Sequence, residues 1–425
     1  MSQASKALIS RGIATLSAFQ YPQFRLYWIG TLTSISGSMI LVIAQGWQVY
    51  QLTGSPLDLG YLGLVYSLPP ILLGLYGGVI ADKIDRRRLI VFAQVTSGVA
   101  VLLLAFLTAG QAVRFWHVLA VASYAGAMRA FDQPSRDAIF PHLLDRKDLD
   151  NAVALNVSIW QVSRVVATAL GGLLIAQFGT PAAFYVSSIA HLVGALPIAM
   201  LKVPPLDRKV ATTITHDIES GLKFIRDNNI FVLILGLTFF TSLFGMGYVQ
   251  LMPIFAEDIL GVGAQGLGFL LSVAGLGSFT GTLMMAALSR SRRKGWFLIG
   301  GSILSGAFVI LFALSHWYLI SLALLFVKGI FNAAYLISGM AIILIRVPDE
   351  LRGRIMGLYG MTWSLSSLGG MAAGAIAGVI GAPYAVALGG VIVLAFTLVI
   401  ATASPRLRRL ESTTPGPVGS HNQGA

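Results

Sequence analysis

The sequence predicts an all-α membrane protein whose twelve transmembrane helices form two pseudo-symmetric six-helix bundles. Three observations support this fold class. Hydrophobic residues make up 56% of the 425 residues, and charged residues make up only 11%. A membrane-spanning helix needs about 20 apolar residues, and the chain contains twelve stretches of that kind. One long polar interruption, residues 202–229, separates six of these stretches from the other six.

The apolar stretches follow one another along almost the whole chain, which leaves little room for a soluble domain. Their centres lie near Ile40, Leu68, Val99, Tyr124, Val166, His191, Phe240, Leu276, Leu304, Ile330, Ala373 and Leu394. The expected organisation is a cytoplasmic N-terminal segment (1–25), an N-terminal bundle (26–201), a cytoplasmic linker (202–229), a C-terminal bundle (230–403) and a cytoplasmic disordered tail (404–425). The tail is rich in Thr, Pro, Gly and Ser, a composition typical of disordered segments.

Basic residues predict the orientation in the membrane. The formal net charge is +12, and 25 of the 29 Lys and Arg residues precede the first stretch or follow an even-numbered one. Cytoplasmic segments carry such an excess of positive charge, so both termini should lie in the cytoplasm and the chain in the inner (plasma) membrane. This distribution by loop indicates contact with membrane lipid and argues against nucleic acid as a partner. We expect the protein to be a monomer.

The two halves repeat one another. A shift of about 208 residues places Leu59-Gly60-Tyr61-Leu62 on Leu267-Gly268-Phe269-Leu270, and Asp82 beside Arg290. A shift of 207 residues places Pro141 on Pro348, Leu144 on Leu351 and Gly171 on Gly378. Internal duplication of this kind is typical of transporters.

The segment from Gly78 to Arg88 reads Gly-Val-Ile-Ala-Asp-Lys-Ile-Asp-Arg-Arg-Arg and interrupts two apolar stretches. It resembles the loop between the second and third helices of major facilitator superfamily transporters, with Asp85 where the family most often has glycine. Its Ala-Asp-Lys-x-Asp-Arg-Arg-Arg form, and the later Arg-Ala-Phe-Asp-Gln-Pro-Ser-Arg of residues 129–136, are similar to the drug and siderophore exporters, a subgroup that includes the enterobactin exporter.

The resemblance implies secondary active transport by rocking of the two halves around a central cavity, coupled to protons. It also implies a cytoplasmic gate, in which Asp82 bonds the start of the eleventh helix, near Pro348, when that side is shut. Gly78 permits the close approach of helices, Asp349 pairs with the basic loop, and Arg352 adds positive charge. The predicted gate residues are Gly78, Asp82, Arg86, Arg87, Asp349 and Arg352. The alternative is that the loop only fixes the topology.

Two basic residues, Arg164 and Lys328, lie near the middle of the membrane stretches. An isolated charge there costs about 2.5–3.5 kcal/mol or more, so such residues usually face a cavity and act in the pathway. They therefore favour an anionic or strongly polar substrate, or a Lys328 that titrates. The alternative is that both reach the interface or bond backbone carbonyls at helix contacts.

Other candidates for substrate binding or coupling lie in the first and fourth stretches. Arg129, Asp132 and Arg136, at i, i+3 and i+7, should form a charge ladder on one helix face, for packing or for ligand contact. Gln45 and Gln48 are expected to line the cavity, with Trp47 between them in the cavity wall or the outer aromatic belt.

Two further positions bear on coupling. Some relatives carry an acid where this chain has Ser38, directly after Gly37. His191 is expected to be a packed polar residue rather than a proton relay.

The chain contains no cysteine and none of three motifs: a phosphate-binding Gly-x-x-x-x-Gly-Lys, a His-Glu-x-x-His metal helix and a Gly-x-Ser-x-Gly nucleophile elbow. We therefore expect no enzyme activity, no cofactor and no metal. The expected function is a proton-coupled exporter of a small amphiphilic or anionic molecule. The alternatives are an importer or a lipid-moving facilitator of the same fold and, from another class, a ligand-binding membrane sensor.

Overall fold

The structure is a computed structural model that describes residues 17–203, 223–226, 228–288, 293–348, 351, 355–356, 359, 362 and 366–403, with the backbone alone for 75–83 and 367. Within these ranges every regular element is a helix. The N-terminal segment expected at residues 1–25 lies mostly outside the described residues, as do most of the linker and the whole tail.

The helices of the first half pack mainly against one another. A short 3₁₀ turn, η1 (Ser17–Gln20), precedes them. They are α2 (Pro22–Thr53), α3 (Pro56–Lys83), α4 (Arg86–Ala109), α5 (Phe115–Ile139), α6 (Leu149–Val162), the π-helical turn η4 (Ser163–Ala167), α7 (Thr168–Phe178) and α8 (Thr180–Ala199), with the 3₁₀ turns η2 (Phe140–His142) and η3 (Arg146–Asp148) between α5 and α6. In this half α2 and α4 pack on α8, and α3 packs on α5.

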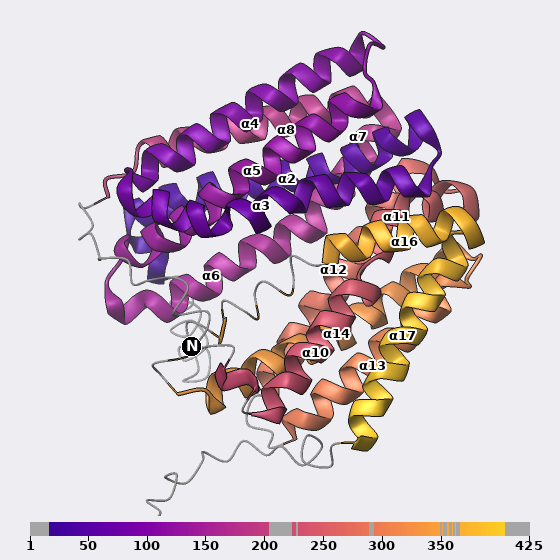
Figure 1. Cartoon of the computed structure of the whole chain (residues 1–425). Coiled ribbons are helices and arrows are strands. Elements are labelled where there is room, and N and C mark those ends of the chain that lie inside the picture. Colours follow the sequence, from indigo (N-terminus) through magenta and orange to yellow (C-terminus); the bar gives the residue numbers. More distant parts are fainter. Residues whose placement is uncertain are drawn as a thin grey trace, which may run out of the picture.

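The second half has the same kind of arrangement (Figure 1). Its helices are α10 (Asn229–Gly245), α11 (Tyr248–Ile254), the π-helical turn η5 (Phe255–Ile259), α12 (Gly263–Ala287), α13 (Lys294–Ala313), α14 (Tyr318–Arg346), α16 (Ser366–Ile380) and α17 (Ala382–Ala403). Here α12 and α13 pack on α14, and α13 packs on α17.

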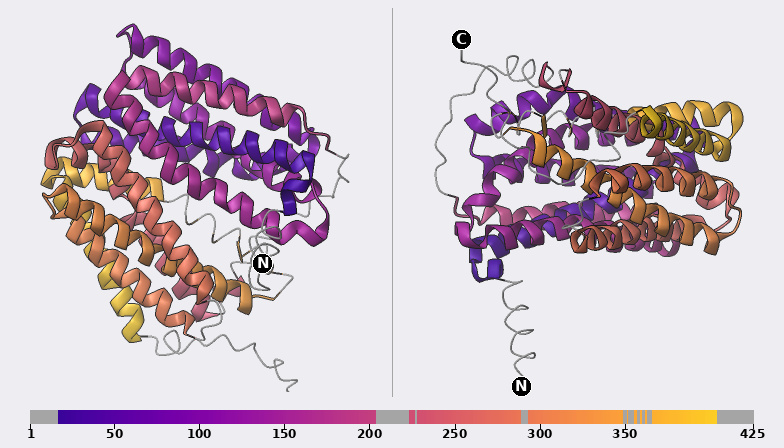
Figure 2. Two further views of the ribbon diagram at one scale, coloured as in Figure 1. Left: turned by 180° about the vertical axis from the view of Figure 1, so that it is seen from behind. Right: turned by 90° about the horizontal axis from the view of Figure 1, so that it is seen from below.

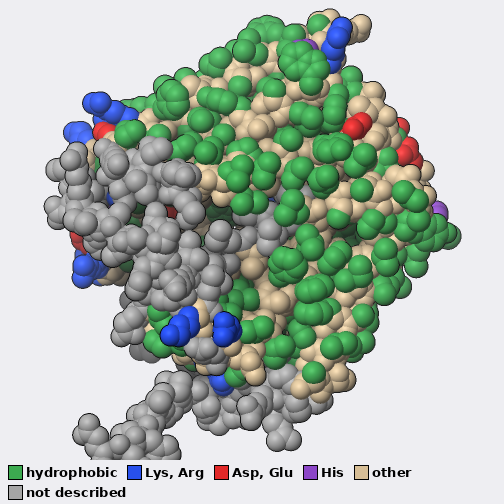
Figure 3. Space-filling view, viewed as in Figure 1, with side chains coloured by type: hydrophobic (Ala, Val, Ile, Leu, Met, Phe, Trp, Pro, Cys, Tyr) green, Lys and Arg blue, Asp and Glu red, His purple; other side chains and the backbone are tan. Residues whose placement is uncertain are grey.

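The predicted fold class is confirmed. Each of the twelve predicted centres lies in a helix, and ten helical segments among the described residues are long and apolar enough to span a membrane. Helix α5 is outside that group because its second half carries four charged residues, and α16 is outside it because its apolar part, Leu368–Ile380, is short. Apolar side chains cover both halves of the visible surface, and most of the visible basic side chains lie along the left and lower parts of this view, with a further one at the top (Figure 3).

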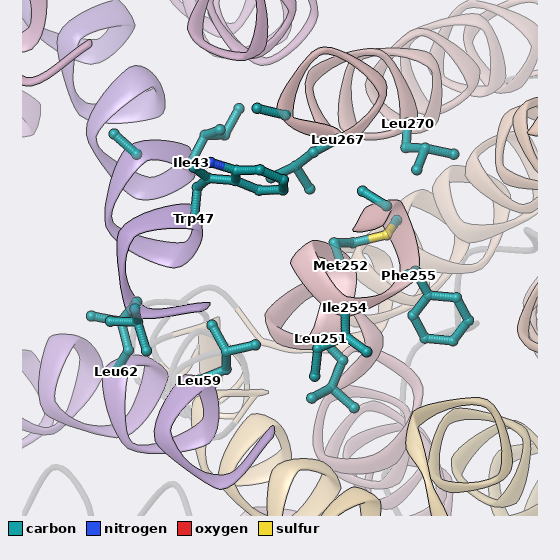
Figure 4. Close-up of a cluster of buried hydrophobic side chains, with 14 of the residues drawn as sticks. Ile43, Trp47, Leu59, Leu62, Leu251, Met252, Ile254, Phe255, Leu267 and Leu270 are labelled. Carbon is teal, nitrogen blue, oxygen red and sulfur yellow. The ribbon is translucent and has the colours of Figure 1, made fainter. Parts of the chain in front are cut away.

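The buried core shows which sides of the halves are in contact. We call the end where α2 begins and α17 ends the terminal face, and the other end the opposite face. One core cluster joins both halves at the opposite face and contains Leu59 and Leu62 of α3 together with Leu251 and Leu267 of the second half (Figure 4). Two further clusters, one around Phe24 and the other around Ile234, each belong to a single half near the terminal face. The halves therefore meet at the opposite face and diverge toward the terminal face, as the views in Figures 1 and 2 show.

Glycines permit the contact between halves. A Cβ atom placed on Gly374 would lie 2.5 Å from the carbonyl oxygen of Pro56, and one placed on Gly172 would lie 2.6 Å from that of Ala264. Gly60 and Gly268 complete the two crossings, α3 with α16 and α12 with α7. Backbones can approach this closely only where side chains are absent.

The two crossings also locate the internal repeat. Pro56 and Gly60 correspond to Ala264 and Gly268 by the predicted shift, so their contact partners, Gly374 and Gly172, are equivalent. The alignment of Gly171 with Gly378 is therefore wrong. Segments of different length separate the equivalent helices in the two halves, so one shift does not hold from α12 to α16.

The glycine contact can be tested on one helix. Gly374→Val should hold the halves apart at the opposite face, because the new side chain overlaps the α3 backbone. A cysteine at Leu59, buried in this structure, should then react several-fold faster with a membrane-impermeant maleimide. The matched control is Gly378→Val, whose added side chain meets no atom within 4 Å; equal labelling of both variants would contradict the contact.

Candidate transport site

A cavity of about 620 Å³ lies between the halves. Its wall is formed by α2, α3 and α5 of the first half and by α11 and α16 of the second. The polar residues that line it are Gln45, Tyr66, Ser67, Arg129, Gln133, Asp137, Gln250 and Ser366. A volume of this size accommodates a drug-sized molecule.

One face of α5 supplies the charged part of this wall. Arg129, Gln133 and Asp137 recur at i, i+4 and i+8, which places them on the same side of the helix. The Arg129 Nη1 donates to the Tyr66 hydroxyl (3.3 Å), and the guanidinium lies over the Trp160 ring, 5.8 Å from its centroid. The Gln133 Nε2 donates to Asp137 Oδ1 (3.0 Å).

A second face of α5 points into the first half. The Arg136 Nε donates to Asp132 Oδ2 (2.8 Å), and the Arg136 side chain also bonds the hydroxyls of Thr31 (2.8 Å) and Ser34 (3.2 Å) on α2. The Gln94 Nε2 donates to the other oxygen of Asp132 (3.2 Å). With 2% of its surface exposed, Arg136 is a buried residue rather than part of a basic loop.

The predicted ladder is therefore divided. Asp132 and Arg136 form a buried ion pair, whereas Arg129 turns to the central cavity and bonds Tyr66. The spacing i, i+3, i+7 correctly gives neighbouring positions on a helix, but the three residues straddle the boundary between the bundle interior and the cavity. Asp137, which completes the cavity face, was missed; its i+8 spacing from Arg129 was the available signal.

A smaller cavity of about 80 Å³ lies inside the first half and is lined by Arg129, Asp132, Arg136 and His191, among others. The His191 Nδ1 is 2.8 Å from the Ser187 carbonyl oxygen, and its Nε2 is 3.2 Å from the Ser38 hydroxyl. The histidine is packed and polar, as expected. No pattern in the sequence indicated that it would bond Ser38.

Lys328 and Arg164 have different surroundings. The Lys328 Nζ donates to the Tyr248 hydroxyl (3.2 Å) and lies 4.5 Å from the centroid of its ring, and the lysine is only 3% exposed. Arg164 lies in η4 and packs its aliphatic stem on Gly275 of α12. Neither basic residue lines the two cavities described above, so their role in the pathway stays a prediction. Tyr248 was missed, although Gly245 and Gly247 mark a helix break directly before it.

The two predicted glutamines also differ in position, since one lines the central cavity and the other does not. Gln45 lines the central cavity, is 2% exposed, and its Nε2 has no protein partner among the described residues. Gln48 is buried and lines neither of the two cavities. Trp47 is likewise buried and belongs to the cluster that joins the halves (Figure 4), so it is neither cavity wall nor aromatic belt.

Only some of the predicted gate residues lie among the described residues. Asp349 and Arg352 lie outside the described residues, and for Gly78 and Asp82 the α3 backbone alone is described. Arg86 begins α4, and the Arg87 Nη1 donates to the Leu201 carbonyl oxygen (2.9 Å) at the end of α8. Asp85 caps α4, since its side chain accepts from the Arg88 backbone N–H (3.3 Å), which gives a local reason for an acid where the family has glycine.

A polar contact that the sequence reading missed joins the halves at the opposite face. The Tyr50 hydroxyl, in the last turn of α2, donates to Asp258 of η5. These residues are 208 positions apart, which is the shift that relates the two halves, so they occupy equivalent positions. The pair lies beside Trp47, whose ring centroid is 5.7 Å from that of Tyr50.

Removing this contact should loosen the opposite face. Tyr50→Phe keeps the ring and loses a charge-assisted hydrogen bond, and because the pair is exposed we expect a cost of only about 1 kcal/mol. The outward-open population, measured by spin-label distances across the opposite face, should rise several-fold. Asp258→Asn should act similarly and should add little to Tyr50→Phe; additive effects would show that the residues act independently.

The buried ion pair should stabilise the first half. Arg136→Ala leaves Asp132 buried without its cation, which typically costs about 3–5 kcal/mol. The melting temperature of the purified protein in detergent should fall markedly, and the double variant Asp132→Asn/Arg136→Ala should recover part of the loss. Arg88→Ala, at a side chain that is 78% exposed, is the control; an equal fall there would contradict the assignment.

Comparison with known proteins agrees with this fold. The profile of a family described as transmembrane secretion effectors matches residues 13–421. The enterobactin exporter EntS of Escherichia coli is 25% identical over 405 residues (93% of this chain, 95% of EntS), and the staphyloferrin A transporter of Staphylococcus aureus is 24% identical over 394 residues (89% and 96%). The multidrug efflux pump Tap of Mycolicibacterium fortuitum is 25% identical over 398 residues (91% and 96%).

Solved structures of transporters share the fold. A bacterial homologue of the human lysosomal transporter Spinster, in an inward-facing and unoccupied conformation, superposes with a TM-score of 0.71 at 17% identity (93% of this chain, 97% of that chain). The nucleoside transporter NupG superposes with a TM-score of 0.68 at 13% identity (90% and 98%). The chain is a multi-pass secondary transporter and belongs to the transmembrane secretion effector family of the major facilitator superfamily.

Proposed function

We propose that this transporter is a proton-coupled exporter of a small amphiphilic molecule with an anionic group, and that it works by alternating access as a monomer. The observation that supports this proposal most is how the buried core is distributed. One cluster joins the halves at the opposite face, whereas toward the terminal face each half has a cluster of its own. A cavity of about 620 Å³ lies between them, and this arrangement corresponds to one end state of a rocking motion.

The proposed orientation puts the terminal face in the cytoplasm of the inner (plasma) membrane. The excess of Lys and Arg at that face supports it. In this orientation the cavity opens to the cytoplasm, which is the loading state of an exporter. Two relatives point the same way, since they are an exporter and an efflux pump.

An anionic group is proposed because the charged donor of the cavity wall is Arg129. Its guanidinium has five N–H donors in a planar fork suited to carboxylates, and Tyr66 accepts from only one of its terminal nitrogens in the contacts above. The apolar part of the substrate would pack on Val42 and Leu62, which line the same cavity.

Proton coupling is proposed on the presence of ionisable groups at the two cavities. Asp137 lines the central cavity, and Asp132 lines the smaller one, which shares Arg129 and Tyr66 with it. Closure of the terminal face is proposed to use Asp82 with the segment that begins near Pro348, as the family resemblance implies.

The test is transport in proteoliposomes with an imposed pH gradient. The probes are a fluorescein dye as organic anion, ethidium as organic cation, and a catecholate siderophore, each measured with and without a protonophore. We expect gradient-dependent movement of the anionic probes, and at least a tenfold loss with Arg129→Gln, because one charge-assisted contact of about 1.5–3 kcal/mol disappears. Lys147→Gln, at a side chain that is 72% exposed and outside the cavity lining, is the matched control. Binding without flux of any probe would instead support a sensor, and flux that ignores the gradient would reject coupling.

A further inference from the structure

The two charges on the cavity face of α5 have opposite signs. Arg129 and Asp137 are the charged residues among those that line the central cavity, and both side chains are exposed to it rather than packed away. By contrast Asp132, between them in sequence, faces the bundle interior and is neutralised by Arg136. The wall of the central cavity is therefore dipolar, with its positive and negative ends on one helix.

Helix geometry keeps these two ends apart. Eight residues at 1.5 Å per residue place Arg129 and Asp137 about 12 Å from each other along α5, well beyond the reach of an ion pair. Gln133 fills the space between them and donates to Asp137 (3.0 Å). The two charges therefore cannot neutralise each other across the face, and both remain available to a molecule in the cavity.

We propose that the central cavity takes a zwitterionic amphiphile, with its anionic group at Arg129 and its cationic group at Asp137, about 12 Å apart. This inference rests on the proposed transport function and specifies its substrate class. It replaces a purely anionic molecule by one that carries both charges at the two ends of an elongated body.

The anionic end is built for recognition. Arg129 is held in place by the Tyr66 hydroxyl and by the ring of Trp160, so little side-chain freedom is lost when a ligand binds. Gln45 lines the same cavity with a buried amide nitrogen that has no protein partner among the described residues. This nitrogen exposes less than 1 Å², so an oxygen of the ligand would bond it only after the Gln45 side chain turns toward the cavity.

The cationic end lies near the terminal face. Asp137 is two residues before the end of α5, so it stands where the halves diverge and where a molecule would enter. Its Oδ1 accepts from Gln133, which fixes the carboxylate on the cavity side of the helix. Elsewhere the wall offers neutral polar groups, Ser67, Gln250 and Ser366, and apolar Leu62 and Pro70.

Binding can be measured on the full-length protein in detergent by quenching of tryptophan fluorescence, since Trp160 lies at Arg129. The probes are an aryl-substituted nine-carbon ω-amino acid, its N-acetyl derivative, which is only an anion, and its methyl ester, which is only a cation. A four-carbon ω-amino acid with the same aryl group tests charge separation. We expect the nine-carbon zwitterion to bind about tenfold more tightly than the other three, because it alone engages both ends.

Two variants test which residue binds which end of the ligand. Asp137→Asn should remove the advantage of the zwitterion over the N-acetyl anion, and Arg129→Gln should remove its advantage over the methyl ester. Asp150→Asn, at an exposed carboxylate outside the cavity lining, should change neither ratio. Equal binding of all four probes by the unmodified protein, or an equal loss for every probe with Asp137→Asn, would overturn the proposal.

Transport of the same probes in proteoliposomes separates this inference from the proposed function. Tight binding of the zwitterion without flux would leave the dipolar site standing and reject transport. Gradient-driven flux of the anion and the zwitterion at equal rates, together with equal binding, would leave the exporter standing and reject the dipolar site.

Discussion

The close approach of the two halves at the opposite face is the constraint on which the rest of the structure depends. At two equivalent crossings, glycine lies against backbone, so α3 meets α16 and α7 meets α12 without intervening side chains. The apolar cluster around Leu251 and Trp47 fills the space beside them. Because this face is shut, the same rigid halves must separate toward the terminal face, and the cavity exists as a result of that separation.

Helix α5 faces two environments, the interior of the first half and the central cavity. Arg136 and Asp132 tie α5 to α2 and α4 in the interior of the first half, which fixes the rotation of the helix about its axis. That rotation then presents Arg129 and Asp137 to the cavity. A buried ion pair thus orients residues that it does not touch, and changes at the pair should reach the cavity through this rotation.

The sequence predicted the fold, the twelve helices and their division into halves, because apolar length and loop charge are local properties of the chain. It named Arg129, Asp132 and Gln45, since charged or amide groups within apolar stretches stand out. It did not predict that Arg129 and Asp132 face different environments, or that the Lys328 ammonium bonds the Tyr248 hydroxyl. Those outcomes depend on helix rotation and on contacts between distant segments. The predicted positions of Trp47 and Gln48 were wrong for the same reason, because the sequence alone does not show which side of α2 each residue occupies.

The Tyr50–Asp258 contact also indicates when it formed relative to the duplication that produced the two halves. The residues occupy equivalent positions, so a symmetric ancestor made of two identical chains would have placed tyrosine against tyrosine or aspartate against aspartate there. Two carboxylates in contact repel each other, and two phenols lack the charged acceptor. The present pair of unlike groups became available only when one gene encoded both copies and each could change alone.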